Sequence, residues 1–162
     1  IANRSSAYLH GNRYGAHDLA PIIFFDSTLR KLEKGYSPFL QEYADHLVAS
    51  TCRIAKTRPV YLLRPLPEMP VDVPRAMARA AQLGRPFEVT MPLATYQQRN
   101  AVVWAAQDRA ARKCKVQLLD PLPALCEGGV CAGNDKTNPL FYDDNHLTEY
   151  GSRKLIDILR KI

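Results

Sequence analysis

The sequence predicts a single α/β domain with a parallel sheet that helices cover on both faces. An amphipathic segment is followed directly by a short apolar run twice, at residues 38–56 then 60–63 and at residues 97–113 then 116–119. The first run is continuously apolar and the second has one polar residue, Gln117, so neither alternates over its length, which is typical of strands buried on both faces. The 162 residues are enough for one compact domain.

Composition and charge narrow the class of protein further. Hydrophobic residues make up 46% and charged residues 23%, which argues against disordered, collagen-like and coiled-coil chains. The densest apolar stretch, residues 21–25, is far too short to span a bilayer. The formal net charge of +6 suits anionic glycans, lipid headgroups or nucleic acid. Because the basic residues are scattered and not interleaved with aromatics, we do not expect nucleic acid to be a partner.

The first half of the chain contains the first helix and strand of the predicted pattern. Residues 1–2 look like the end of a strand, so we expect the chain to lack the first part of its domain. Apolar residues at spacings of three and four predict a helix over 38–56: Leu40, Tyr43, Ala44, Leu47, Val48 and Cys52. A buried strand at 60–63 then stops at Pro65, and a proline-rich loop runs to Pro74.

The second half repeats the pattern and ends in a helix. A short helix is predicted over 76–83, and a longer one over 97–113 with one face marked by Ala101, Trp104, Ala105 and Asp108. A strand follows at 116–119, and a final helix is predicted over 147–162. Thr148 is its expected N-cap, and its expected apolar stripe consists of Leu155, Leu159 and Ile162.

One loop carries the residues of greatest chemical interest. Reactive groups of open parallel sheets gather beyond the carboxyl ends of the strands, which points to loops 3–8, 64–70 and 120–146. In the last of these, Asp143 precedes His146 by three residues, just before a helix. A carboxylate placed there can hold one ring nitrogen while the other takes a proton, so the pair can act as a general base. The alternative is that Asp143 and Asp144 are solvated turn residues and that His146 caps the helix.

These residues also resemble a known family. Asp143-Asp144-Asn145-His146-Leu147 followed by Gly151 is similar to the D-x-x-H-L block of the SGNH (GDSL-like) hydrolase superfamily. Further stretches resemble the SGNH domain fused to acyltransferase-3 membrane proteins, over nearly the whole chain: residues 2–5, 66–69, 72–74, 96–100, 118–126, 131 and 139–142. The resemblance implies a flavodoxin-like three-layer α/β/α fold with no cofactor and no metal.

The family's chemistry implies acyl transfer by a Ser-His-Asp triad, with His146 as the base and Asp143 as its orienting carboxylate. The family's Gly-Asp-Ser nucleophile block is absent from this sequence, so we expect the serine outside the chain and the fragment alone to be inactive. Asn3 or Arg4 would be the oxyanion or substrate-binding residue, although no Gly precedes Asn3 as it does in the family's G-x-N block.

The function that the resemblance implies is extracytoplasmic O-acyl transfer, most simply of acetyl, to a cell-surface polysaccharide or lipopolysaccharide sugar. A membrane acyltransferase domain in the same polypeptide would deliver the acyl group and tether the domain to the inner membrane, on its periplasmic side. Two alternatives stay open: a carbohydrate esterase or lipase that uses water as the acceptor, and a non-catalytic glycan-binding or partner-docking module.

The four cysteines indicate the redox state of the cellular compartment in which the protein lies. Cys126 and Cys131 enclose two glycines, and this spacing permits a disulfide worth about 2 kcal/mol and implies an oxidising compartment. A zinc site is the alternative, although the spacing is poor for one. Cys52 and Cys114 each lie near the end of a helix that feeds a strand, so they either pair or remain as buried thiols.

Four other residues could line a site but have simpler explanations. His10, His17 and His46 have no partner block at comparable spacing and are expected on the surface. Glu68 lies in the proline-rich loop, where it either lines the cleft or shapes the loop.

Overall fold

The computed structural model describes residues 24–25, 31–32, 37–160 and 162. The chain divides into two compact units. The first unit contains the described residues up to 65 together with 99–120, and the second contains 66–98 and the described residues from 121 onward. The long helix α4 passes from the second unit into the first.

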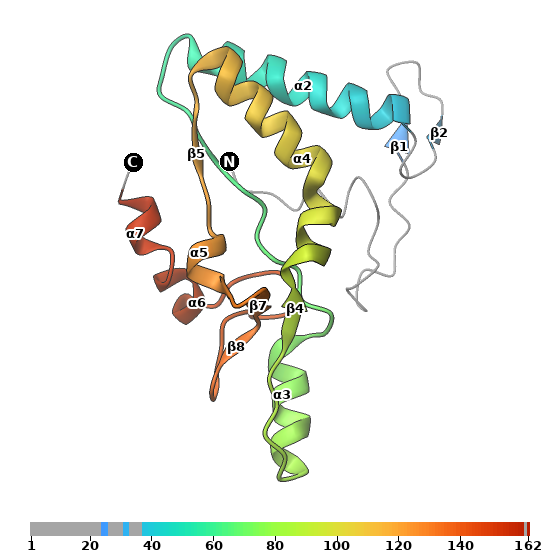
Figure 1. Cartoon of the computed structure of the whole chain (residues 1–162), viewed down its shortest axis with the longest axis vertical. Helices are drawn as coiled ribbons and strands as arrows, with labels where there is room; N and C mark the ends of the chain where they lie inside the picture. The colour runs from blue at the N-terminus through green and yellow to red at the C-terminus, as the bar shows by residue number, and fades with distance from the viewer. Residues whose placement is uncertain (1–23, 26–30, 33–36, 161) are drawn as a thin grey trace. The chain divides into compact units, whose positions relative to one another are not determined.

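The first unit is an α/β unit with a parallel strand pair. Figure 1 shows its helices α2 and α4 and its strand β5. Strands β3 and β5 are parallel, with Leu62 opposite Leu118. A second, antiparallel pair consists of β1 and β2. The parallel pair confirms the α/β class that the sequence predicts. The elements of this unit are β1 (Phe24–Phe25), β2 (Lys31–Leu32), α2 (Ser37–Ala55), β3 (Tyr61–Leu63), most of α4 (Leu93–Cys114) and β5 (Gln117–Leu119).

Helices α2 and α4 pack on this pair through an apolar cluster. Its buried members come from both helices, from β3 and from the residue before β5: Val48, Leu62, Ala110 and Val116. The cluster also contains Cys52 and Cys114, which form a disulfide between the carboxyl-terminal parts of the two helices. Of the two alternatives for these cysteines, the structure therefore supports pairing.

The buried face of α4 differs from the predicted one. Val103, Ala106 and Ala110 are buried, whereas Ala101 and Ala105 are exposed. The prediction was wrong because alanine fits exposed and buried helix positions equally well, so a stripe of alanines does not identify the buried face.

Trp104 lies at the edge of the buried face of α4, half-buried rather than in the core. The guanidinium of Arg64 lies over its ring, 4.3 Å from the centroid. Arg64 is itself buried and forms an ion pair with Asp108 at 2.5 Å, while Gln107 donates to the carbonyl oxygen of Leu63. A buried arginine is held here because its donors and its charge are both satisfied.

The second unit consists of short elements around an antiparallel sheet in the order β4-β7-β6 and a small β8–β9 hairpin. Sequence analysis assigns none of these strands, because strands of two or three residues are too short to show an alternating pattern. The elements of this unit are α3 (Val73–Gln82), β4 (Thr90–Pro92), α5 (Leu122–Leu125), β6 (Cys126–Glu127), β7 (Val130–Ala132), β8 (Asn134–Asp135), β9 (Asn138–Pro139), α6 (Glu149–Arg153) and α7 (Ile156–Leu159).

A buried asparagine ties the segment before β4 to the β8–β9 hairpin. The Asn134 side-chain oxygen accepts a hydrogen bond from the N–H of Val89 at 2.8 Å. Its amide nitrogen donates to the carbonyl oxygens of Phe87 at 3.3 Å and Lys136 at 2.8 Å. One side chain therefore satisfies three backbone groups that no strand pairing reaches.

The predicted final helix over 147–162 is broken. Thr148 is the N-cap as predicted, but the helix divides into α6 and α7 around Leu155. Leu155 is buried, whereas Leu159 and Ile162 are 44% and 66% exposed. The apolar stripe therefore has one buried member, and there is little burial to hold a continuous helix together.

Candidate functional site

The Asp/His loop, residues 141–147, is closed at its base by backbone bonds. Phe141 and Leu147 form an antiparallel bridge, and the N–H of Tyr142 donates to the carbonyl oxygen of His146 at 2.6 Å. Phe141 is completely buried and anchors one side of the loop. The residues between them form a tight turn that presents Asp143 and His146 on the same loop.

Both carboxylate oxygens of Asp143 are used within this turn. Oδ1 accepts hydrogen bonds from the N–H groups of Asn145 at 2.8 Å and His146 at 2.7 Å. Oδ2 lies 2.6 Å from Nδ1 of the His146 ring. Partial burial raises the pKa of Asp143, but the two backbone donors and the imidazole outweigh it, so the pKa lies below its ordinary value. Asp143 is therefore an ionised, oriented acceptor near neutral pH.

The imidazole ring of His146 is held in one orientation and is also accessible to solvent. Its side chain is 74% exposed, while that of Asp143 is 30% exposed. Because Asp143 occupies Nδ1, the other ring nitrogen, Nε2, is the one left to exchange a proton with another molecule. This is the geometry that general-base catalysis by a histidine requires.

The alternative, in which the aspartates are solvated turn residues and His146 caps the helix, does not describe the structure. Thr148, not His146, caps α6, since its side chain accepts from the N–H of Gly151. Asp144 is not a solvated turn residue either, because it is 6% exposed and its Oδ1 accepts a hydrogen bond from the Asn145 side chain.

The proline-rich loop holds the Asp/His loop from one side. The N–H of Met69 donates to the carbonyl oxygen of Asp144 at 2.6 Å, and the N–H of Val73 donates to that of Asp143 at 3.2 Å. Met69 and Val73 are completely buried, and Glu68 is 4% exposed. Of the two roles considered for Glu68, this burial favours shaping the loop.

Helix α6 holds the Asp/His loop from its other end. The N–H of Thr148 donates to the carbonyl oxygen of Leu140 at 2.9 Å, and its Oγ1 lies 2.9 Å from that of Pro139. Gly151 packs so closely against Leu140 that a Cβ at this position would overlap the Leu140 carbonyl oxygen. The glycine three residues after Thr148 is therefore needed for α6 to approach the Asp/His loop.

The other candidate residues stand as follows. Asn3 and Arg4 lie outside the described residues, as do His10 and His17. His46 is on the surface as predicted, 75% exposed and 3.6 Å from a Glu42 oxygen.

The cysteines of the second unit form the predicted disulfide. Cys126 and Cys131 are bonded across the paired strands β6 and β7, with their Cα atoms 3.9 Å apart. The zinc alternative is therefore wrong, because these sulfurs are engaged with each other. Among the described residues, no group of three or more histidine, cysteine and acidic side chains is placed to hold a metal ion.

Sequence reasoning found the pair but not what holds it. The backbone amides of Met69 and Val73 fix the Asp/His loop, and a backbone donor cannot be predicted from a pattern of side chains. Gly151 was part of the motif, although its packing role is visible only in the structure.

An α/β protein that holds an exposed histidine on an aspartate has the features of an enzyme that handles acyl groups or esters. The family model for the SGNH domain (fused to AT3 domains) matches residues 1–161, and the chain belongs to that family. Membership supports an acyl- or ester-related function of the hydrolase and acyltransferase type. No curated protein and no solved structure matches the chain.

Proposed function

We propose that this chain is part of an extracytoplasmic O-acyltransferase that moves an acyl group, acetyl in the simplest case, onto a cell-surface sugar. The observation that carries the proposal is the Asp143–His146 pair, with Nδ1 held at 2.6 Å and the ring 74% exposed. His146 is the general base, and Asp143 fixes its tautomer and stabilises its charged form. The nucleophile is a serine of the longer polypeptide, since no Gly-Asp-Ser sequence occurs in the 162 residues.

The reaction proceeds in two steps. The serine Oγ attacks the acyl carbonyl carbon while Nε2 of His146 takes its proton, the donor's leaving group departs with that proton, and a serine ester forms. A sugar hydroxyl then gives its proton to Nε2 and attacks this ester, and the proton returns to the serine Oγ as it leaves. Asn3 or Arg4 would donate to the oxyanion that forms in each step.

Several features support the setting of this reaction. Two disulfides fit an oxidising, extracytoplasmic compartment, which for this proposal is the periplasm. The family's fusion to AT3 domains supports an acyl donor from a membrane domain of the same polypeptide, which would also tether the chain to the inner membrane. Separately, none of the helices in the described part of the chain qualifies as a membrane span. A net charge of +6 suits an anionic carbohydrate acceptor.

The test uses a polypeptide that contains this chain together with its serine block. Transfer of acetyl from 4-nitrophenyl acetate to an oligosaccharide is followed by mass spectrometry, alongside release of free acetate. We expect His146→Ala to abolish transfer and His46→Ala, a matched exposed histidine beside an acidic residue, to leave it unchanged.

The outcomes separate the candidate functions. Acetate release without transfer to any acceptor contradicts the transferase and leaves the esterase, which uses the same residues with water. Equal activities of the His146 and His46 variants contradict catalysis by the pair. Carbohydrate binding with no turnover leaves the glycan-binding module.

A further inference from the structure

The end of α3 and the loop after it form a surface that the proposed function does not use. Residues 81–88 are eight consecutive exposed residues, Ala-Gln-Leu-Gly-Arg-Pro-Phe-Glu. Among them Leu83 is 63% exposed and Phe87 is 45% exposed. Leaving two large apolar side chains in water within one short segment is unfavourable, and such patches mark contact surfaces. We call residues 75–88 the α3 tip.

The charges of the α3 tip are strongly one-sided. Helix α3 contains Arg75 and Arg79 and no acidic residue, and Arg85 follows in the loop. All three arginines are exposed, and none of them pairs with an acidic residue in the described part of the chain. Only Glu88, at the far end of the segment, has the opposite sign. Unpaired cations around apolar side chains complement a surface that is both anionic and apolar.

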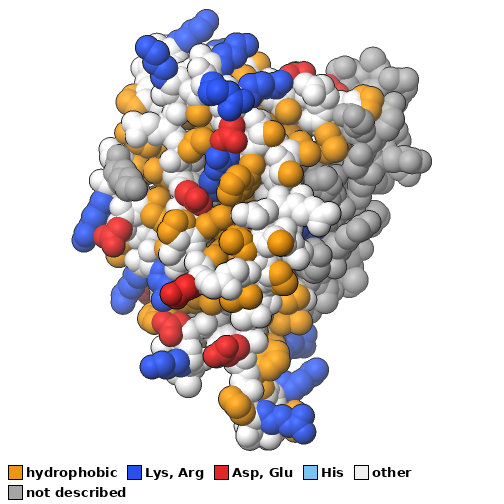
Figure 2. Space-filling view, viewed as in Figure 1, with side chains coloured by type: hydrophobic (Ala, Val, Ile, Leu, Met, Phe, Trp, Pro, Cys, Tyr) orange, Lys and Arg blue, Asp and Glu red, His pale blue; other side chains and the backbone are white. Residues whose placement is uncertain are grey.

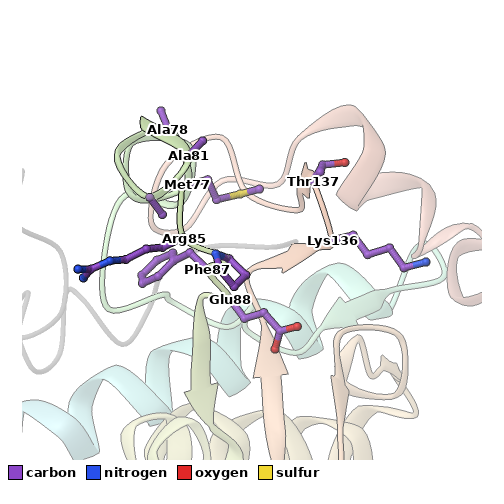
Figure 3. Close-up of a pocket in the computed structure, with 10 residues that line it drawn as sticks. Met77, Ala78, Ala81, Arg85, Phe87, Glu88, Lys136 and Thr137 are labelled. Carbon is purple, nitrogen blue, oxygen red and sulfur yellow. The ribbon is translucent and has the colours of Figure 1, made fainter. Parts of the chain in front are cut away.

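A hollow of about 510 Å³ opens beside these residues, within the second unit. Its apolar lining includes Met77, Ala81 and Phe87. Figure 3 shows Met77 extending from α3 toward Thr137, while the side chains of Arg85 and Lys136 extend outward on opposite sides. The hollow therefore has an apolar interior, with two cations and one carboxylate, that of Glu88, at its edges. In Figure 2 the same end of the second unit shows orange and blue side chains together.

We infer that the α3 tip docks on the surface of an anionic phospholipid bilayer. Arginine stems can lie along the acyl boundary while their guanidinium groups reach lipid phosphates. Leucine and phenylalanine beside them can enter the interface, as in amphipathic helices that lie in the membrane plane. A soluble polyanion would satisfy the arginines but would leave Leu83 and Phe87 in water, so the apolar exposure favours a lipid surface.

The expected affinities follow from these contacts. Each basic residue near an anionic membrane strengthens binding about fivefold, so three arginines favour anionic over neutral vesicles by about a hundredfold. Losing the part of one phenylalanine side chain that the bilayer would bury weakens binding by roughly threefold to tenfold. Replacing the apolar residues and replacing the arginines should therefore each reduce binding.

The test is co-sedimentation of the whole chain with vesicles. We expect binding to vesicles of phosphatidylglycerol and phosphatidylcholine and little binding to phosphatidylcholine alone. Leu83→Ser with Phe87→Ser, and separately Arg79→Gln with Arg85→Gln, should each weaken binding at least tenfold. Leu159→Ser, at a leucine 44% exposed, and Arg53→Gln with Arg58→Gln, at exposed arginines elsewhere, are the matched controls and should bind normally.

Insertion is measured separately. The chain has one tryptophan, Trp104, so Phe87→Trp adds a second reporter whose emission is obtained by subtraction. Brominated lipid should quench the added tryptophan and leave Trp104 unaffected. Binding that depends on the arginines but not on Leu83 and Phe87, without quenching, overturns the inference in favour of a soluble polyanion. Absence of binding to anionic vesicles overturns it outright.

Discussion

Replacing Gly151 by alanine tests whether the approach of α6 to residues 140–141 holds the Asp/His loop. On helix propensity alone, Gly→Ala in α6 should stabilise the protein by about 1 kcal/mol. The packing predicts the opposite, because the new Cβ would overlap the carbonyl oxygen of Leu140 and lie 2.9 Å from its carbonyl carbon. The neighbour is backbone, so it cannot rotate away as a side chain could.

The magnitude follows from the bonds that must yield. If α6 moves away, three hydrogen bonds of Thr148 are strained. Its N–H donates to the carbonyl oxygen of Leu140 at 2.9 Å and its hydroxyl to that of Pro139 at 2.9 Å, and its Oγ1 accepts from the N–H of Gly151 at 3.0 Å. Each is worth about 1 kcal/mol net. After the propensity gain is deducted, Gly151→Ala should destabilise by about 2 kcal/mol, or roughly 6 °C in Tm for a chain of this size.

The assay is thermal unfolding followed by circular dichroism at neutral pH, with Ser152→Ala as the control. Ser152 is exposed and is the next residue in α6, so its replacement should leave Tm unchanged or raise it slightly. If Gly151→Ala has a Tm equal to or above that of the wild type, α6 does not hold the loop as we describe.

Four further predictions follow from the same structure. Asp143→Asn should lower acyl turnover of the longer polypeptide by about 10⁴-fold, as loss of an orienting carboxylate does in a triad, and kcat at neutral pH measures it. The pKa of Asp143 is lowered in the folded state, so its stabilising effect is complete above about pH 5 and is lost as the pH falls through that lowered pKa. When Tm is measured against pH, the curves of the wild type and of Asp143→Asn should therefore converge in acid. Replacing both cysteines of the Cys52–Cys114 bridge by serine should cost about 4 kcal/mol against about 2 kcal/mol for Cys126–Cys131, since the sequence separations are 62 and 5; guanidinium unfolding compares them. Asn134→Ala should cost about 2 kcal/mol in the same assay, because three backbone groups lose their partner.

The parts of the fold that could be predicted are those with long periodic patterns. Helix α2 and strands β3 and β5 lie where the sequence predicts them, and their parallel pairing follows from the helix-to-strand order. The sequence does not decide whether Cys52 and Cys114 pair, because their disulfide depends on β3 and β5 being neighbours, which no local pattern shows. The sheet β4-β7-β6 could not be predicted, since its strands have two or three residues each.

The candidate site divides in the same way. Asp143 and His146 could be paired from spacing because a contact over three residues is local. The donors from Met69 and Val73 lie some 70 residues away and are backbone amides, so they leave no trace in the residue types.

The backbone of the Asp/His loop links the charge of Asp143 to the orientation of His146. Two of the three hydrogen bonds that the carboxylate accepts come from N–H groups of the loop itself, and the third partner is the imidazole. Protonating Asp143 would weaken all three together, so the turn would loosen at the same pH at which the ring loses its orientation. Because these bonds also lower the pKa of Asp143, that pH lies below the ordinary range of a carboxyl group. Between neutral pH and that point, the carboxylate should therefore keep its charge, and the loop should keep both its backbone bonds and the orientation of the ring.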